Sequence, residues 1–280
     1  MAKKGWNAFA YPNKAYDYSG SKLAKVWPKL HAGSCEPFPD EKRVAHLLKA
    51  HPSLGTDPAA IAAQLQDAWR AFHRGEFQRA YELGIALGPM GASLAIKAGG
   101  VHASYLLDNE SEQIKRYEGL IRIAEESVEA QPDEPNAYYP HAYAIGRYSQ
   151  LISITTALKQ GLAGKVRTSL ERTLELQPDH AEASTALGLF HAEIVGKLGS
   201  MLARLTYGAS AAEAEKYLRR GVELIPDAPI GWIEYGRGLL LLHGEKAEDQ
   251  VAEAFDTAAK LKPRDAMEDL DSRWAREQIE

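Results

Sequence analysis

Five prolines along the chain follow stretches that share one pattern of large and small residues. The residues 12, 8 and 5 positions before Pro178 fall on one face of a helix; they are Val166, Leu170 and Thr173. Proline has no amide hydrogen to donate, so each such helix is predicted to end near its proline. The other four prolines stand in the same frame; they are Pro89, Pro132, Pro226 and Pro263.

Small residues recur after the prolines as well. Leu187 and Gly188 lie nine and ten residues past Pro178, and the missing side chain at Gly188 would let a second helix approach closely. This frame resembles the tetratricopeptide repeat (TPR), although the proline spacings of 43, 46, 48 and 37 residues exceed the usual repeat of about 34. We expect an all-α, right-handed TPR-like α-solenoid of four to five antiparallel helix hairpins with elongated repeats.

The frame after Pro263 predicts a cap at the end of the array. Its corresponding positions hold Asp269, Ser272 and Arg273, which a buried face between repeats would not tolerate. We therefore expect a capping helix over about 266–280 with a narrow inward stripe, consisting of Met267, Leu270 and Trp274. The solvent-facing residues of this helix should be Glu268, Asp271, Arg276, Glu277 and Glu280.

Residues 1–57 are predicted to form a basic, aromatic arm of mostly irregular structure, with one short helix over Asp40–Ala50, ahead of the repeat domain at 58–280. The first 30 residues hold six lysines against one acid, whereas the whole chain carries −5. Lysines interleaved with aromatic residues such as Trp6 could contact nucleic acid. We favour an arm that folds back on the acidic body, and expect no nucleic-acid partner.

The extra residues of the long repeats fall near 146–165 and 192–210, between the two helices of a hairpin. Both stretches are more apolar than a solvated loop. In the second, four residues share one helical face; they are Ile194, Leu198, Leu202 and Leu205. We favour an amphipathic extension packed on the convex side. The alternative is a helix that contacts a membrane surface or a partner.

Residues 138–263 also resemble the regulator of microtubule dynamics family and related bacterial repeat proteins. The shared motifs are Leu187-Gly188-x-x-His191 and Ala203-Arg204-Leu205-x-Tyr207-Gly208, followed by the hairpin that closes at Pro226. These are mainly packing residues. The resemblance therefore implies the fold and carries no microtubule role with it.

Function in such a solenoid belongs to the concave face, which the first helix of each hairpin builds. Residues 4, 7, 11, 14 and 15 positions past each proline should point there, beginning with Ser93 and Asn136. The predicted groove consists of Tyr139, Tyr143, Arg147, Glu182, Leu189, Ile233, Arg237 and Leu240. Tyrosine and arginine are enriched at interface hot spots, which suits an extended peptide. Alternatively, some of these side chains pack on the chain's own aromatic arm.

Catalytic patterns are weak. His31 and Cys35 could form a nucleophile pair, but no third group is evident and a surface or packed cysteine is the better interpretation. Three histidines recur near corresponding repeat positions and are expected to be packed rather than metal ligands; they are His102, His141 and His191. We predict no metal, no cofactor and no catalysis.

The single cysteine suits a reducing compartment, and neither a signal-peptide run nor a long apolar window is present, so we expect a cytoplasmic protein. The predicted function is a non-catalytic scaffold that binds a protein or peptide partner in the groove. One alternative is a carrier of a lipid or small apolar ligand. The other is a Cys35-dependent enzyme.

Overall fold

The computed structural model describes residues 5–280, and this range is helical without any strand. This architecture confirms the predicted all-α class. Contacts group the chain into two compact units. Unit 1 comprises the N-terminal part up to His31, Glu36–Leu162 and Asp265–Met267, and unit 2 comprises Ala32–Cys35, Ala163–Arg264 and Glu268–Glu280. The boundary after residue 57 divides the chain differently and stays a prediction.

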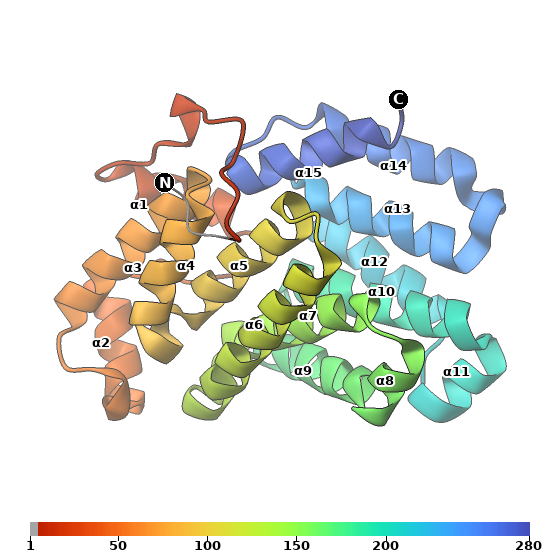
Figure 1. Ribbon diagram of the computed structural model, residues 1–280, viewed down its shortest axis with the longest axis horizontal. Coiled ribbons are helices and arrows are strands. Elements are labelled where there is room, and N and C mark those ends of the chain that lie inside the picture. The colour runs from red at the N-terminus through yellow and green to blue at the C-terminus, as the bar shows by residue number, and fades with distance from the viewer. Residues whose placement is uncertain (1–4) are drawn as a thin grey trace. The chain divides into compact units, whose positions relative to one another are not determined.

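Unit 1 is built from helical hairpins (Figure 1). Helices α3 and α4 pack together, α5 and α6 form the next hairpin, and α7 packs on both α5 and α6. Its α-helices are α1 (Lys22–Leu30), α2 (Glu41–Ala50), α3 (Pro58–His73), α4 (Phe77–Ala86), α5 (Ala92–Leu106), α6 (Glu110–Ala130), α7 (Pro135–Leu151) and α8 (Ile154–Lys159). Short 3-10 helices are η1 (Lys14–Tyr16), η2 (Pro52–Leu54) and η3 (Gly88–Gly91).

Unit 2 repeats the hairpin plan. Helix α10 packs on α12 and on α13, and α13 packs on α14. The elements are α9 (Leu162–Leu176), α10 (Ala181–Leu198), α11 (Ser200–Tyr207), α12 (Ala211–Leu224), α13 (Pro229–His243), η4 (Gly244–Ala247), α14 (Glu248–Lys260) and α15 (Ala266–Glu277).

The proline frame agrees with the helix ends. Pro132, Pro178 and Pro226 each stand two residues past the last residue of a helix, namely α6, α9 and α12. A close approach also occurs at Gly188, as predicted. A Cβ there would lie 2.8 Å from the backbone nitrogen of Leu218, so only glycine lets α10 sit this near α12.

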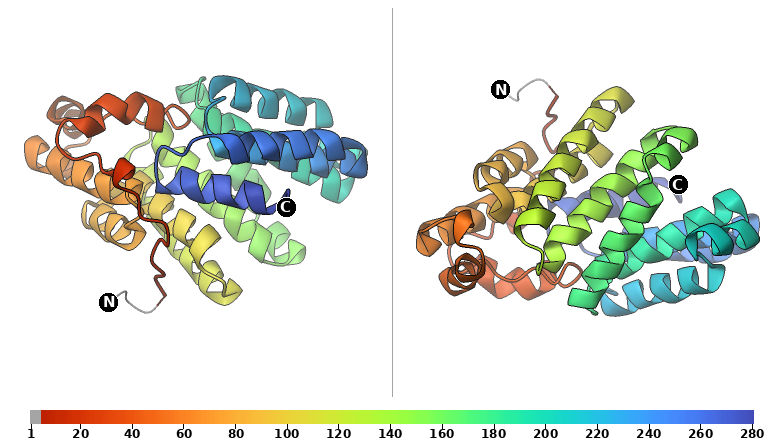
Figure 2. Two further views of the ribbon diagram at one scale, coloured as in Figure 1. Left: turned by 90° about the horizontal axis from the view of Figure 1, so that it is seen from above. Right: turned by 90° about the horizontal axis from the view of Figure 1, so that it is seen from below.

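Between residue 5 and Pro58 the chain contains two α-helices. Helix α2 matches the predicted short helix, and Asp40 caps it by accepting the amide of Arg43 at 2.7 Å. Helix α1 was not predicted, because Pro28 lies inside it and its apolar stripe is short. Figure 2 shows the extended arm running beside the helices of unit 1.

The arm makes specific contacts within unit 1. The Trp6 ring lies 4.3 Å from the His102 ring and 5.2 Å from the Tyr81 ring, and the Arg116 guanidinium covers its face at 3.9 Å. The amide of Asn7 donates to His102 Nε2 at 2.8 Å. The described part of the arm therefore folds back on its own unit, which agrees with the favoured interpretation.

The polar face of α15 corrects the predicted cap. Glu268 and Asp271 were expected to face water, yet both are buried, as are Asp269 and Ser272. Two of these carboxylates each pair with an arginine: Glu268 with Arg264, and Asp269 with Arg273 at 2.7 Å. Periodicity alone cannot reveal such pairing, which makes a buried carboxylate tolerable. Arg276, Glu277 and Glu280 are exposed, as predicted.

Both insertions contain short helices, α8 and α11. Leu202 and Leu205 on α11 are exposed. The expectation that this face packs on the convex side of the solenoid is therefore wrong for these two residues.

Candidate binding site

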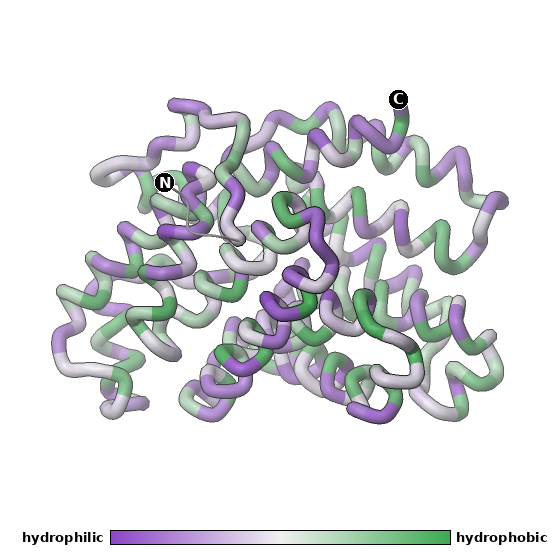
Figure 3. Tube along the Cα trace, viewed as in Figure 1, coloured by the Kyte–Doolittle hydropathy of each residue, from purple (hydrophilic) through white to green (hydrophobic). Residues whose placement is uncertain are grey.

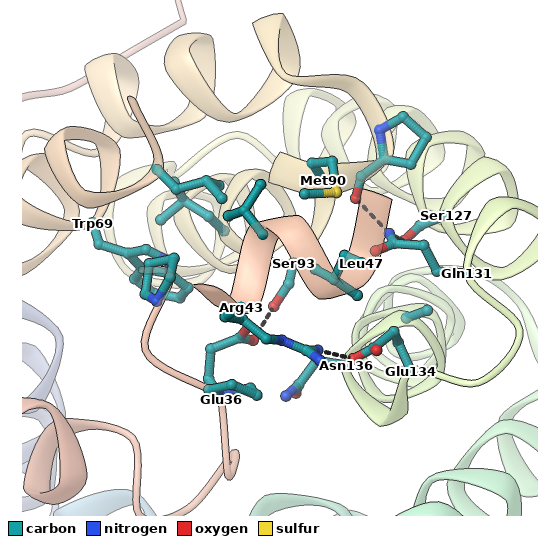
Figure 4. Close-up of a pocket in the computed structure, with 17 residues that line it drawn as sticks. Glu36, Arg43, Leu47, Trp69, Met90, Ser93, Ser127, Gln131, Glu134 and Asn136 are labelled. Atoms are coloured by element: carbon teal, nitrogen blue, oxygen red, sulfur yellow. Dashed lines mark hydrogen bonds and ion pairs between the residues drawn. The ribbon is translucent and has the colours of Figure 1, made fainter. Parts of the chain in front are cut away.

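A small pocket lies within unit 1, lined by residues of α2, α3, η3, α5, α6 and α7 (Figure 4). Its volume is about 50 Å³, room for a side chain or a few water molecules. One wall is apolar and consists of Val44, Leu47, Leu65, Trp69, Met90 and Leu94. The other carries charged and amide groups, so the pocket combines an apolar surface with a few convergent polar groups, as binding sites commonly do.

The polar wall is organised around Glu36. Ser93 Oγ donates to the Glu36 carboxylate at 3.0 Å, and beside them Arg43 pairs with Glu134 (Figure 4). Burial of the carboxyl raises the pKa of Glu36 to about 7, against the hydrogen bond from Ser93 and the charge of Arg43, which lower it. At neutral pH a larger share of Glu36 is therefore protonated than of an ordinary glutamate.

Local sequence positions these groups. Pro37 and Pro39 flank Phe38 in a stretch without regular structure, which leads from Glu36 to the cap of α2. The cap sets the first turn of α2 and so places Arg43. Gln131 closes another side, because its amide donates to the carbonyl of Pro89 at 2.7 Å and ties η3 to the end of α6.

Counting positions past each proline predicts that Ser93 and Asn136 lie on the inner helix faces. Both residues line the pocket. Sequence reasoning missed Glu36, Arg43 and Glu134. These three belong to a loop, the first turn of a helix and a helix cap, where no periodic signal operates. The capping position of Asp40 was the one local signal that bore on Arg43.

A buried histidine cluster lies behind the apolar wall. The ring of Trp69 stacks on His73, whose Nδ1 is 2.8 Å from a carboxylate oxygen of Asp265. The Nε2 atoms of His73 and His31 are 3.3 Å apart, and His31 stacks on Trp27. Burial, with the nearby His73, holds the pKa of His31 well below its usual range. His31 is therefore a packed neutral imidazole.

Cys35 is a partly buried free thiol. Its sulfur donates to the carbonyl of Asp179 at 3.4 Å. Burial raises its pKa, and the carboxylates of Asp179 and Glu182 raise it further. A thiol held in its protonated form is a poor nucleophile.

The predicted groove residues of unit 1 lie along α7 and are partly exposed. The Tyr143 ring packs against α5 so closely that a Cβ on Gly100 would come within 2.4 Å of it. The Arg147 guanidinium lies 5.8 Å from the centre of that ring. Tyr143 thus contacts a neighbouring helix, and Tyr139 and Arg147 remain partly open to solvent.

The predicted groove residues of unit 2 lie on α10 and α13. Glu182, Leu189 and Arg237 are partly exposed, and Leu240 is exposed. Ile233 is a correction: it is buried in the core that α13 forms with α14, where its side chain packs instead of pointing outward. Counting positions past the proline failed for Ile233 because α13 is apolar around most of its circumference.

The three histidines of the repeat differ in their surroundings. Burial lowers the pKa of His102 to about 4, with the Arg116 charge acting in the same direction. His191 stacks on Tyr217 with the ring centres 6.0 Å apart. His141 is partly exposed. Within residues 5–280, no group of three or more histidine, cysteine, aspartate or glutamate side chains is arranged to hold a metal ion.

A solved structure with a similar fold is the crystal structure of a thermophilic TPR protein from Thermus thermophilus. The match has a TM-score of 0.54 and covers 79% of this chain and 100% of that chain, at 14% sequence identity. The chain has a TPR-like fold. No family model and no curated protein matches the sequence. This TPR-like fold confirms the predicted α-solenoid class, whereas the narrower resemblance to the regulator of microtubule dynamics family is not shown.

Proposed function

We propose that this TPR-like protein is a non-catalytic scaffold that holds an extended segment of a partner protein on the inner faces of its first helices. The observation that carries the proposal is selective exposure. Tyr139 and Arg147 on α7, and Arg237 and Leu240 on α13, keep solvent access although neighbouring residues on the same helices are buried. Tyrosine and arginine are the residue types that most often supply binding energy at interfaces.

The pocket supports the same function in unit 1. Ser93 and Asn136 line the pocket and are the first predicted inner-face residues of α5 and α7. Its volume of about 50 Å³ suits one side chain of a bound segment. A carboxyl with a raised pKa, near an arginine, can adjust its charge to an incoming polar group.

The enzyme and carrier alternatives receive less support. The raised pKa of Cys35 disfavours a thiolate nucleophile. The pocket is too small for a lipid chain.

Protein rather than nucleic acid is the proposed partner, because Trp6 of the basic arm is already covered by Arg116. Among the described residues, no helix is long and apolar enough to cross a membrane. A cytoplasmic location is part of the proposal.

Site-specific photo-crosslinking tests the proposed groove. A photoreactive amino acid at Tyr139 or Leu240 should give discrete crosslinked proteins in cells. The same group at exposed positions of second helices, Glu126 on α6 and Arg219 on α12, serves as the matched control. Arg237→Ala should reduce the crosslink formed at Leu240. Equal crosslinking at all four positions would show that the inner faces are not the binding surface.

A further inference from the structure

Helix α11 is an addition to the hairpin formed by α10 and α12. Helix α10 ends at Leu198, and Gly199, with φ 76°, turns the chain into α11. Ala203, on the inner side of α11, is buried, and Arg167 donates to the carbonyl of Tyr207 at the end of the helix. A left-handed glycine, Gly208 with φ 61°, terminates the helix. The helix is therefore fixed in place by its inner side and its end.

The outer side of α11 is apolar and open to solvent. Met201 and Leu205 are each 77% exposed, and Leu202 is 56% exposed. At about 100° per residue these side chains span roughly 100° of the helix circumference. The hydropathy trace shows apolar residues interspersed with polar ones along α11 (Figure 3). Three large apolar side chains gathered on one exposed face form a patch of the kind that marks an interaction site.

The sequence stretch that carries this face has basic residues and no acidic ones. No acidic residue occurs from Ile194 to Ala212, whereas Lys197 and Arg204 both lie in this stretch, in a chain whose net charge is −5. Both basic residues are exposed, and Lys197 makes an ion pair with Glu193 at 3.2 Å. A face with apolar and basic residues complements an anionic, partly apolar surface.

The insertion that contains α8 combines exposed apolar residues with basic residues in the same way. In α8, Ile154 is 60% exposed and Leu158 is 53% exposed, and Lys159 follows them. No acidic residue occurs from residue 135 to residue 170. Two separate insertions thus each expose apolar side chains in an acid-free, basic stretch.

We propose that α11 docks on the surface of a membrane containing anionic phospholipids. Met201, Leu202 and Leu205 enter the boundary between headgroups and acyl chains, and Arg204 and Lys197 face the lipid phosphates. A membrane fits better than a partner groove because the exposed apolar side chains of α11 lie between Met201 and Leu205, a span of less than two turns. Helix-in-groove recognition uses anchors over at least two full turns in register, whereas a lipid interface requires no register. Helix α8 supplies a weaker contact of the same kind.

Vesicle flotation with the full chain tests this proposal. The protein should float with phosphatidylcholine vesicles that contain phosphatidylglycerol, bind pure phosphatidylcholine vesicles much less, and dissociate at high salt. The double variant Leu202→Ser with Leu205→Ser should lose at least roughly tenfold in partition coefficient. Arg204→Glu should also weaken binding.

The matched control is Ile85→Ser, which removes an exposed apolar side chain from α4 and should leave partitioning unchanged. Circular dichroism would establish that each variant is folded. Wild-type protein that fails to float, or a double variant that floats equally well, would overturn the proposal. If sedimentation instead showed self-association that the double variant abolishes, without vesicle binding, the face would belong to a second copy of this chain. The groove proposal would survive any of these results, because its crosslinking positions lie outside α11.

Discussion

The pocket of unit 1 and helix α11 of unit 2 depart from a simple repeat in opposite directions. In the pocket, Glu36 and Glu134 are drawn into the protein and each meets a hydrogen-bonding or charged partner. On α11, Leu202 and Leu205 are left in water. Burying a polar group is costly unless the fold supplies a partner, whereas exposing an apolar side chain forgoes a stabilising contact. Changes in the pocket region should therefore alter stability, and changes on α11 should alter binding.

The largest expected effect of a change in the pocket region lies behind the apolar wall of the pocket. Asp265→Ala removes the carboxylate that holds His73, leaving a buried imidazole nitrogen without its partner. We expect the free energy of unfolding to fall by about 2–3 kcal/mol. Denaturant titration measures it. The control is Asp256→Ala on α14, whose ion pair with Lys260 is solvent-exposed and should matter by less than about 0.5 kcal/mol. Equal losses for the two variants would contradict the structural role of Asp265.

The next effect is a pH dependence at Glu36. Its pKa in the folded state, about 7, lies above the ordinary value of 4.5. The folded state therefore holds this proton more tightly, and its contribution to stability is lost as pH rises from about 4.5 through 7. Glu36→Gln should remove this loss. Relative to wild type, we expect the variant to gain about 2 kcal/mol between pH 5 and pH 8.

Unfolding free energies of wild type and Glu36→Gln at the two pH values provide the measurement. Glu41→Gln, an exposed change on α2, is the control and should show no comparable difference. If the gap between wild type and Glu36→Gln is the same at both pH values, Glu36 does not titrate in the folded protein as described.

A smaller effect is expected at the ion pair beside Glu36. Arg43 and Glu134 are partly buried, with side chains 24% and 20% exposed, so their coupling should exceed that of a surface pair only moderately. A double-mutant cycle with Arg43→Ala and Glu134→Ala should give a coupling energy of about 1 kcal/mol. Strictly additive single changes would show that the pair contributes no mutual stabilisation.

The smallest stability effect should occur on α11. Leu202→Ser combined with Leu205→Ser removes exposed side chains and should change the free energy of unfolding by less than about 0.5 kcal/mol. Leu218→Ala, at the buried contact with Gly188, should cost about 2–5 kcal/mol. Thermal and denaturant unfolding of both would sharpen the contrast. A large loss in the α11 variant would mean that its outer face packs on protein after all.

Much of the fold could be predicted from local patterns. The helix ends near Pro132, Pro178 and Pro226 follow from a missing amide hydrogen, and the close approach at Gly188 follows from a missing side chain. The candidate site was predictable only in part. Ser93 and Asn136 follow the repeat frame, whereas Glu36 has a partner 57 residues away that no periodicity connects to it.

The sequence by itself determined the succession of helices, because prolines, glycines and apolar periodicity act over a few neighbouring residues. Tertiary structure alone decided which carboxylates are buried and which leucines are exposed. His73 and Asp265 stand 192 positions apart, and the buried carboxylate of Glu268 pairs with Arg264. The physical reason is that burial depends on which residues from elsewhere in the chain pack against a side chain. On the outer face of α11, Leu202 and Leu205 are left exposed.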